Sequence, residues 1–144
     1  GVKYWENLGK FMENNEQKEI PQIIKNVGFD FRWDSEKVWA LEVPVTEMDI
    51  NDLVWHFDIP FWEVADTDDY NLTPNAVINR EERTHMHREK IEKADASFPI
   101  DIMENKGRWL ILDGLHRLVK LYEQGAKTVR VRIIPREKIP EILK

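Results

Sequence analysis

The chain has 144 residues, 42% of them hydrophobic and including six Trp and six Phe, so it is long enough to bury the core of one domain. Its net charge of −6 and its pI near 5.3 oppose general affinity for nucleic acids, which depends on clustered Lys and Arg. Cys is absent, which excludes disulfides and thiolate metal sites, and the lack of a long apolar run or a signal-like start predicts a cytoplasmic protein with no membrane partner.

The N-terminal part predicts helices. Apolar residues recur at helical spacing over 4–12, and again over 20–27, where Pro21 suits a first turn and Gly28 a C-terminal stop. The alternation in 29–33 then predicts a strand or an extended arm. We therefore expect residues 1–35 to form a helical N-terminal extension.

The next segments predict a strand and short helices. Residues 38–45 read as a strand ended by Pro44, and 48–57 as a short helix or turn with Asp49 or Asn51 as cap. The aromatic run 59–62 is better explained by core packing than by a pocket. The acidic residues 66–69 lack the glycine and distal Glu of a calcium loop, so they predict a solvated loop. Thr73 and Pro74 predict a helix start.

A charged run from Arg80 to Lys93 reads as a surface helix whose arginines form i, i+4 ion pairs. His85 and His87 within it point about 200° apart around a helix axis, so no zinc site is expected there. We predict no metal-ligating residues elsewhere in the chain.

Residues 109–113 join a buried strand to an amphipathic helix. Residues 109–112 are continuously apolar, which is typical of a strand buried on both faces. After them, apolar residues recur at helical spacing from Leu115 to Tyr122, and Gly125 offers a stop. A last strand over 128–134 alternates Val or Ile with Arg130 and Arg132, which predicts a solvated two-arginine face.

The junction carries the most informative motif, Asp113-Gly114-Leu115-His116-Arg117. A helix start offers unpaired amides and the positive end of the helix dipole, Gly114 permits close approach, and Arg117 can bind an anion with two hydrogen bonds. Asp113 and Gly114 are also explained as an ordinary cap and a tight turn, but that explanation does not require His116 and Arg117. We therefore predict a phosphate or nucleotide site formed by Gly114, Leu115, His116 and Arg117.

The order of these segments resembles the ParB/sulfiredoxin superfamily. The resemblance rests on Phe98–Met103, the turn 104–107, the strand 108–112, the motif at 113–117 and the strand 128–134, and residues 79–134 would form the superfamily core. It implies an α+β fold with a small mixed sheet flanked by helices, in one domain over 1–144. It also implies that the helix N-terminus binds the phosphate of a nucleotide or a nucleic acid.

Departures from the family pattern restrict the activity. Sulfiredoxin needs a cysteine in this motif and the chain has none. Partition proteins follow this domain with a helix-turn-helix and a dimerisation region, whereas only ten residues follow Ile134 here. The motif is similar to the D-G-H-H-R motif of superfamily kinases that phosphorylate free serine. This similarity implies ATP or another nucleotide with Mg²⁺ as cofactor. It also implies catalytic roles for Asp113 and His116, with His116 donating a hydrogen bond to developing charge. Glu42 and Glu47 remain equal candidates for a separate catalytic carboxylate.

Three functions follow from the sequence. The first is a domain that binds a nucleotide or another phosphorylated small molecule, with ATP-dependent phosphotransfer to a small molecule or nucleotide hydrolysis as its reaction. The second is a regulatory module that binds a nucleotide or a protein partner without chemistry. The third is a DNA-associated nuclease of ParB type, which the acidic pI disfavours.

Overall fold

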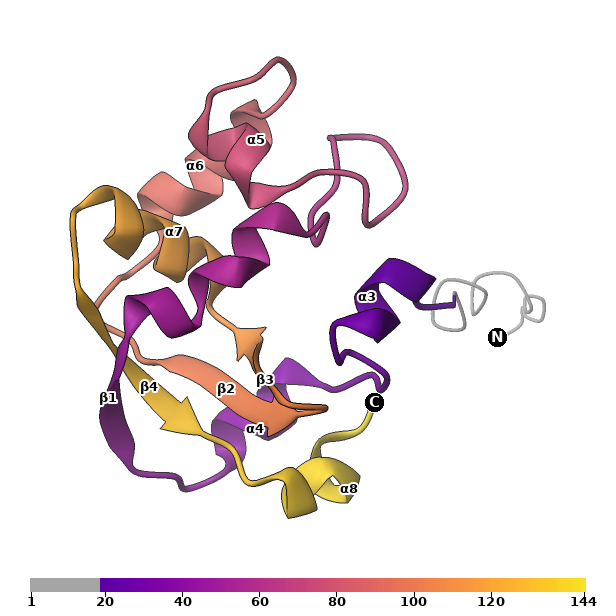
Figure 1. Ribbon diagram of the computed structural model, residues 1–144, viewed down its shortest axis with the longest axis vertical. Helices are drawn as coiled ribbons and strands as arrows, with labels where there is room; N and C mark the ends of the chain where they lie inside the picture. The colour runs from indigo at the N-terminus through magenta and orange to yellow at the C-terminus, as the bar shows by residue number, and fades with distance from the viewer. Residues whose placement is uncertain (1–18) are drawn as a thin grey trace.

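Four strands form one mixed sheet in the computed structural model, which describes residues 19–144 (Figure 1). Their order is β1 (Val45–Asp49), β4 (Thr128–Ile133), β2 (Ile100–Asn105) and β3 (Arg108–Asp113). The β1–β4 and β2–β3 pairs are antiparallel, whereas β2 and β4 run parallel at the centre. The predicted α+β class with a small mixed sheet and flanking helices is confirmed.

Helices cover both faces of the sheet, and Figure 1 places α5 (Pro74–Ile78), α6 (His85–Lys93) and α7 (Leu115–Glu123) on the opposite side from α8 (Ile139–Ile142). The larger core joins Ile102, Ile111 and Val131 of the sheet to the helices of one layer. That layer comprises η1 (Ile50–Asp52), η2 (Val54–Asp58), α5 (Pro74–Ile78), α6 (His85–Lys93) and α7 (Leu115–Glu123). A smaller core around Met103 and Leu112 packs against the other layer. That layer comprises α4 (Ser35–Ala40), η3 (Arg136–Lys138) and α8 (Ile139–Ile142).

Strand β3 is buried on both faces, as its continuous apolar run predicts. Ile111 belongs to the larger core and Leu112 to the smaller one. Leu110 packs against a third cluster with Ile24 of α3 (Gln22–Asn26). Since β3 ends at Asp113, the burial of its residues fixes where the motif begins.

The prediction of a strand over 38–45 is wrong. Residues 35–40 form α4, because Asp34 caps the helix by accepting a hydrogen bond from the amide of Glu36 at 2.9 Å, and Val38 is buried against the smaller core. The strand begins at Val45, immediately after Pro44. The helix predicted over 4–12 lies outside the described residues.

Other local predictions are confirmed. Asp49 caps η1 through the amide of Asn51, and Thr73 caps α5 through the amide of Ala76. The acidic residues 66–69 lie in an exposed loop. Within residues 19–144, no helix combines the length and the apolar character that crossing a bilayer requires.

The predicted ion pairs within the 80–93 run are wrong for two of its arginines. Arg88 instead binds Glu123 of α7 with two hydrogen bonds, of 3.0 and 3.1 Å, and Arg80 reaches the same carboxylate at 3.3 Å. Arg80 also has a positive φ, so one helix does not span the run. These contacts join α6 to α7, which carries the motif.

Candidate functional site

Gly114 forms the turn between β3 and α7 in a backbone conformation that suits glycine. Its φ is 115°, and a Cβ there would lie 3.2 Å from a side-chain atom of Ile100 and 3.2 Å from the Arg117 guanidinium. The helical hydrogen bonds of α7 begin at Leu118, whose amide donates to the Gly114 carbonyl at 2.9 Å. The preceding amides are those of a helix start, which attracts anions.

A pocket of about 430 Å³ opens beside this turn. We call it the charged pocket, because two aspartates and two arginines line it. The exposed rings of Trp39 and Phe98 flank these charges, with 55% and 60% of their surfaces accessible. The described residues that line it are Trp39, Phe98, Pro99, Asp101, Asp113, Arg117 and Arg132.

Asp113 and Arg117 are bound to each other inside the charged pocket. The Arg117 Nη2 donates to Asp113 Oδ2 at 2.8 Å, and its Nη1 donates to the Pro99 carbonyl. The indole N–H of Trp39 donates to the same Asp113 oxygen at 2.8 Å. The motif thus places its carboxylate and its guanidinium in one hydrogen-bonded group.

The structure adds a second charged pair that the sequence analysis missed. Asp101 of β2 lies opposite Asp113 of β3 in the strand register, and it accepts a hydrogen bond from Arg132 at 2.8 Å. Burial raises the pKa of the Asp101 carboxyl, and Arg132 opposes that rise. Arg132 is therefore not the solvated side chain that its strand pattern predicts. The sequence signal for this pair was Asp101 itself, an acidic residue between two apolar residues of β2, which needs a charged partner when it is buried.

His116 does not line the charged pocket and belongs to a stack of three rings. Its Nε2 lies 3.0 Å from Nδ1 of His87, and both imidazoles lie nearly parallel to the indole of Trp62, with centroid distances of 4.3 and 4.7 Å. His87 and Trp62 are buried. Burial lowers the pKa of His116 to about 3 and also lowers the pKa of His87. Both rings are therefore neutral at pH 7.

The hydrogen bonds assign the tautomers of this histidine pair. His87 Nε2 lies 2.8 Å from the Glu63 carbonyl, which can only accept, so His87 carries its proton on Nε2. Its Nδ1 must then accept from Nε2–H of His116. The remaining nitrogen of His116, Nδ1, is left as an acceptor. Donation from that nitrogen to developing charge, the role the kinase similarity implies, would require a protonated ring.

Histidine ¹⁵N NMR at pH 7 should therefore find His87 and His116 as Nε2–H tautomers. His56 is an internal control, because its hydrogen bonds assign the other tautomer. Its Nδ1 lies 2.7 Å from the Leu53 carbonyl, and its Nε2 accepts from the Ile111 amide at 3.0 Å. We expect His56 to be the Nδ1–H tautomer. An Nδ1–H signal for His116, with His56 as expected, would contradict the assignment.

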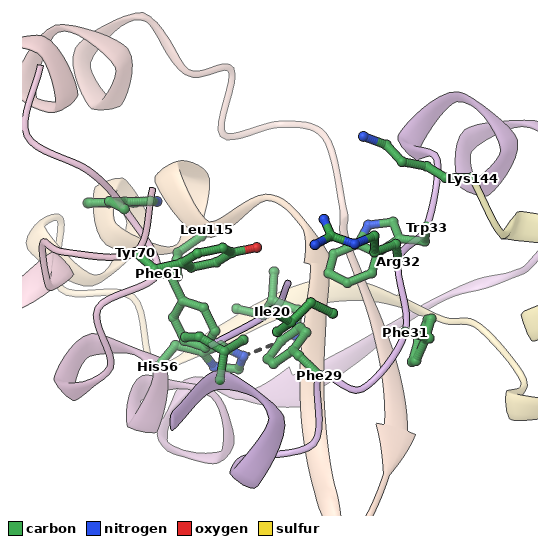
Figure 2. Close-up of a pocket in the computed structure, with 13 residues that line it drawn as sticks. Ile20, Phe29, Phe31, Arg32, Trp33, His56, Phe61, Tyr70, Leu115 and Lys144 are labelled. Carbon is green, nitrogen blue, oxygen red and sulfur yellow. Dashed lines mark hydrogen bonds between the residues drawn. The ribbon is translucent and has the colours of Figure 1, made fainter. Parts of the chain in front are cut away.

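Leu115 and the candidate carboxylates lie elsewhere. Leu115 lines a different cavity, of about 290 Å³, which we call the aromatic pocket (Figure 2). Glu42 is exposed at a third pocket, and Glu47 lies on β1 opposite Arg130. Neither Glu lines the charged pocket. The structure thus brings Asp113 and Arg117 together and separates them from His116 and Leu115.

No group of three or more potential metal ligands occurs in the part of the chain that the structure describes. His85 is exposed and pairs with Glu89 at 3.2 Å, whereas His87 is buried against His116. The two histidines thus lie in different environments, as helical spacing predicts.

Comparisons with known proteins add little. No protein-family model and no curated protein matches the chain. Among solved structures, sulfiredoxin from Arabidopsis thaliana is 18% identical, over 67% of this chain and 93% of that chain, with a TM-score of 0.33. A TM-score of 0.33 is too low for this similarity to assign a function to the chain.

Proposed function

We propose that the protein binds a nucleotide or another phosphorylated small molecule in the charged pocket, with the phosphate at the start of α7. One observation carries the proposal: Asp113 and Arg117 of the motif share a cavity of about 430 Å³ with a second Asp–Arg pair and two exposed aromatic rings. Exposed Trp39 and Phe98 rings offer flat surfaces on which a base can stack. The cavity is within the usual size range of small-molecule sites.

The charges of the pocket suit a phosphate that arrives with a cation. Both arginines are neutralised by aspartates, so a phosphate alone would compete with Asp113 for Arg117. Mg²⁺ typically uses one or two carboxylates together with the phosphates of its substrate. Asp113 and Asp101, at paired positions of β2 and β3, fit that donor set. Arg117 would then be released to bind the phosphate with two hydrogen bonds.

The reaction we propose for this site is ATP-dependent phosphotransfer to a small molecule. Such a reaction depends mainly on positioning and on charge stabilisation. Arg117 and the first amides of α7 would hold the transferring phosphate, and Asp113 would orient the acceptor hydroxyl or hold Mg²⁺. His116 does not line the charged pocket and is a weak base with a pKa of about 3, so it would take no proton in this reaction.

A second candidate is a binding module without chemistry. It is favoured by the internal contacts of the motif, since Arg117 and His116 are both engaged with other side chains. A nucleotide that binds but is neither hydrolysed nor transferred to any acceptor would support this candidate. Accumulation of a phosphorylated small molecule would support phosphotransfer.

The test of binding is a thermal-shift screen against ATP, CTP, GTP, ADP and inorganic phosphate, each with and without Mg²⁺. A ligand at a hundred times its Kd stabilises the native state by about 2.7 kcal/mol, which is a shift of several degrees. We expect a larger shift with Mg²⁺, loss of the shift in Arg117→Lys, and a smaller shift in Trp39→Ala.

Arg130→Lys is the matched control, because Arg130 is exposed on β4 and does not line the charged pocket. This variant should keep the wild-type shift. No shift with any of the five compounds, or equal shifts in both arginine variants, would contradict the proposal.

A further inference from the structure

The aromatic pocket is a cavity built from rings that belong to distant parts of the sequence. Among residues 19–144, the Phe, Trp and Tyr side chains that line it are Phe29, Phe31, Trp33, Phe61, Trp62 and Tyr70. Its volume of about 290 Å³ is roughly twice that of an engineered cavity of about 150 Å³ that binds benzene. A molecule of one or two fused rings therefore fits.

Contacts among the rings and with the backbone hold the walls of this pocket in place. Phe29 packs edge-on against Phe61 at a centroid distance of 5.1 Å, and it lies tilted by 33° against Trp33 at 5.6 Å. The indole N–H of Trp33 donates to the Leu112 carbonyl at 2.9 Å. Because these rings are fixed before a ligand arrives, binding costs little ordering of side chains.

Two cationic side chains, Arg32 and Lys144, lie at the opening of this apolar cavity. Figure 2 shows the guanidinium of Arg32 between the Tyr70 hydroxyl and Trp33, with the Lys144 amine further out on the same side. The Lys144 amide donates to the Arg32 carbonyl at 3.3 Å, and Trp33 bridges to Leu143, so the backbone holds both residues together. Within residues 19–144, neither cationic group has an anionic partner or a hydrogen-bond acceptor.

The two pockets therefore differ in charge balance. The arginines of the charged pocket are paired with Asp101 and Asp113, whereas the cations of the aromatic pocket are not neutralised by described residues. Two cations without an anionic partner among the described residues are unusual in a chain of net charge −6. An apolar cavity with a few convergent polar groups is typical of a small-molecule site, in which the polar groups fix the orientation of the ligand.

We propose that the aromatic pocket is a second ligand site, which binds a small flat aromatic molecule carrying one anionic group. The ring would lie among Phe29, Trp33 and Phe61, and the anion would accept hydrogen bonds from Arg32 and Lys144. A carboxylate and a phosphate ester share this chemistry. The site is separate from the charged pocket and does not depend on nucleotide binding there.

Three naphthalene derivatives test this proposal on the full chain: 2-naphthoate, 2-naphthyl phosphate and the neutral 2-naphthalenemethanol. Isothermal titration calorimetry should give an affinity at least about tenfold higher for an anion than for the neutral compound, since a charge-assisted hydrogen bond is worth that factor or more. Preference for the phosphate or for the carboxylate would identify the type of natural anion, and either preference supports the site.

Arg32→Gln and Lys144→Gln should each remove most of the advantage of the anions and leave the affinity for the neutral compound unchanged. Lys144 is exposed, so its replacement tests the site even if Arg32→Gln disturbs the fold. Arg130→Gln, an exposed arginine outside both pockets, is the control and should bind like the wild type. Equal affinity for all three compounds, absence of binding, or anion binding that survives both substitutions would overturn the proposal.

Substitutions in each pocket can distinguish ligand binding in the aromatic pocket from nucleotide binding in the charged pocket. Arg117→Lys should leave binding of the naphthyl anions unchanged, and Arg32→Gln should leave the nucleotide shift unchanged. Loss of naphthyl binding in Arg117→Lys would contradict a separate site.

Discussion

Lowering the pH from 7 to 5 should reduce the free energy of unfolding by about 4 kcal/mol, or about 2 kcal/mol for each of two buried histidines. Burial lowers the pKa of His56 and of His116 to about 3, from an ordinary value of 6.5. Below pH 6.5 the unfolded chain therefore takes up protons that the folded chain excludes. The stability that these residues contribute is present above pH 6.5 and is lost as the pH falls toward 3.

Urea unfolding at pH 7, 6 and 5 measures this effect. His87 adds to it, since its pKa is also lowered, and Asp101 opposes it at lower pH because its carboxyl pKa is raised. In His56→Gln the same drop in pH should cost only about 2 kcal/mol, because one of the two protected rings is gone. A free energy of unfolding that stays constant from pH 7 to pH 5 would contradict the burial of neutral histidines.

Replacing Arg132 by Met should destabilise the protein by about 3 to 5 kcal/mol at pH 7, because it leaves a buried charge without its partner. Asp101 is only 2% exposed and is bound by Arg132 at 2.8 Å. Arg132 also donates to the carbonyls of Leu41 and Val38, which would lose that donor. Since protonation removes the buried charge of Asp101, the loss relative to the wild type should shrink as the pH falls.

A double-mutant cycle separates the ion pair from the packing around it. Adding Asp101→Asn to Arg132→Met should recover part of the lost stability, because the buried group is then neutral at every pH. Arg130→Met, two residues earlier on β4, removes an exposed side chain that donates one hydrogen bond, to the Ser97 carbonyl, so it should change the stability by at most about 1 kcal/mol. Equal losses in the two arginine variants would show that the buried pair contributes nothing specific.

The fold was largely predictable where the signal is local. The apolar run before Asp113 and the helical spacing after it predicted β3 and α7, and Thr73 with Pro74 predicted the start of α5. The segment 38–45 was assigned wrongly because its apolar residues suit a strand as well as a short helix. The cap at Asp34 and packing against α8 decide in favour of the helix.

The candidate site was predictable only as a motif. The sequence placed Asp113 and Arg117 four residues apart near a helix start, which accounts for their ion pair. The sequence did not predict that Asp101 and Trp39 lie beside Asp113, or that His87 lies beside His116. These partners are 12 to 74 residues apart in the sequence, and only the tertiary fold brings them together. The roles of Gly114, Leu115, His116 and Arg117 in binding stay predictions until a ligand is tested.

The strand order has a consequence for how the chain folds. β4 is the last strand of the sheet in the sequence, yet it lies between β1 and β2, and it pairs Val45 with Arg132. The β2–β3 hairpin can form early from neighbouring residues, whereas β1 has to wait until β4 is synthesised. On the ribosome, the hairpin would thus exist before the sheet, and closure of a loop of some eighty residues would limit the folding rate.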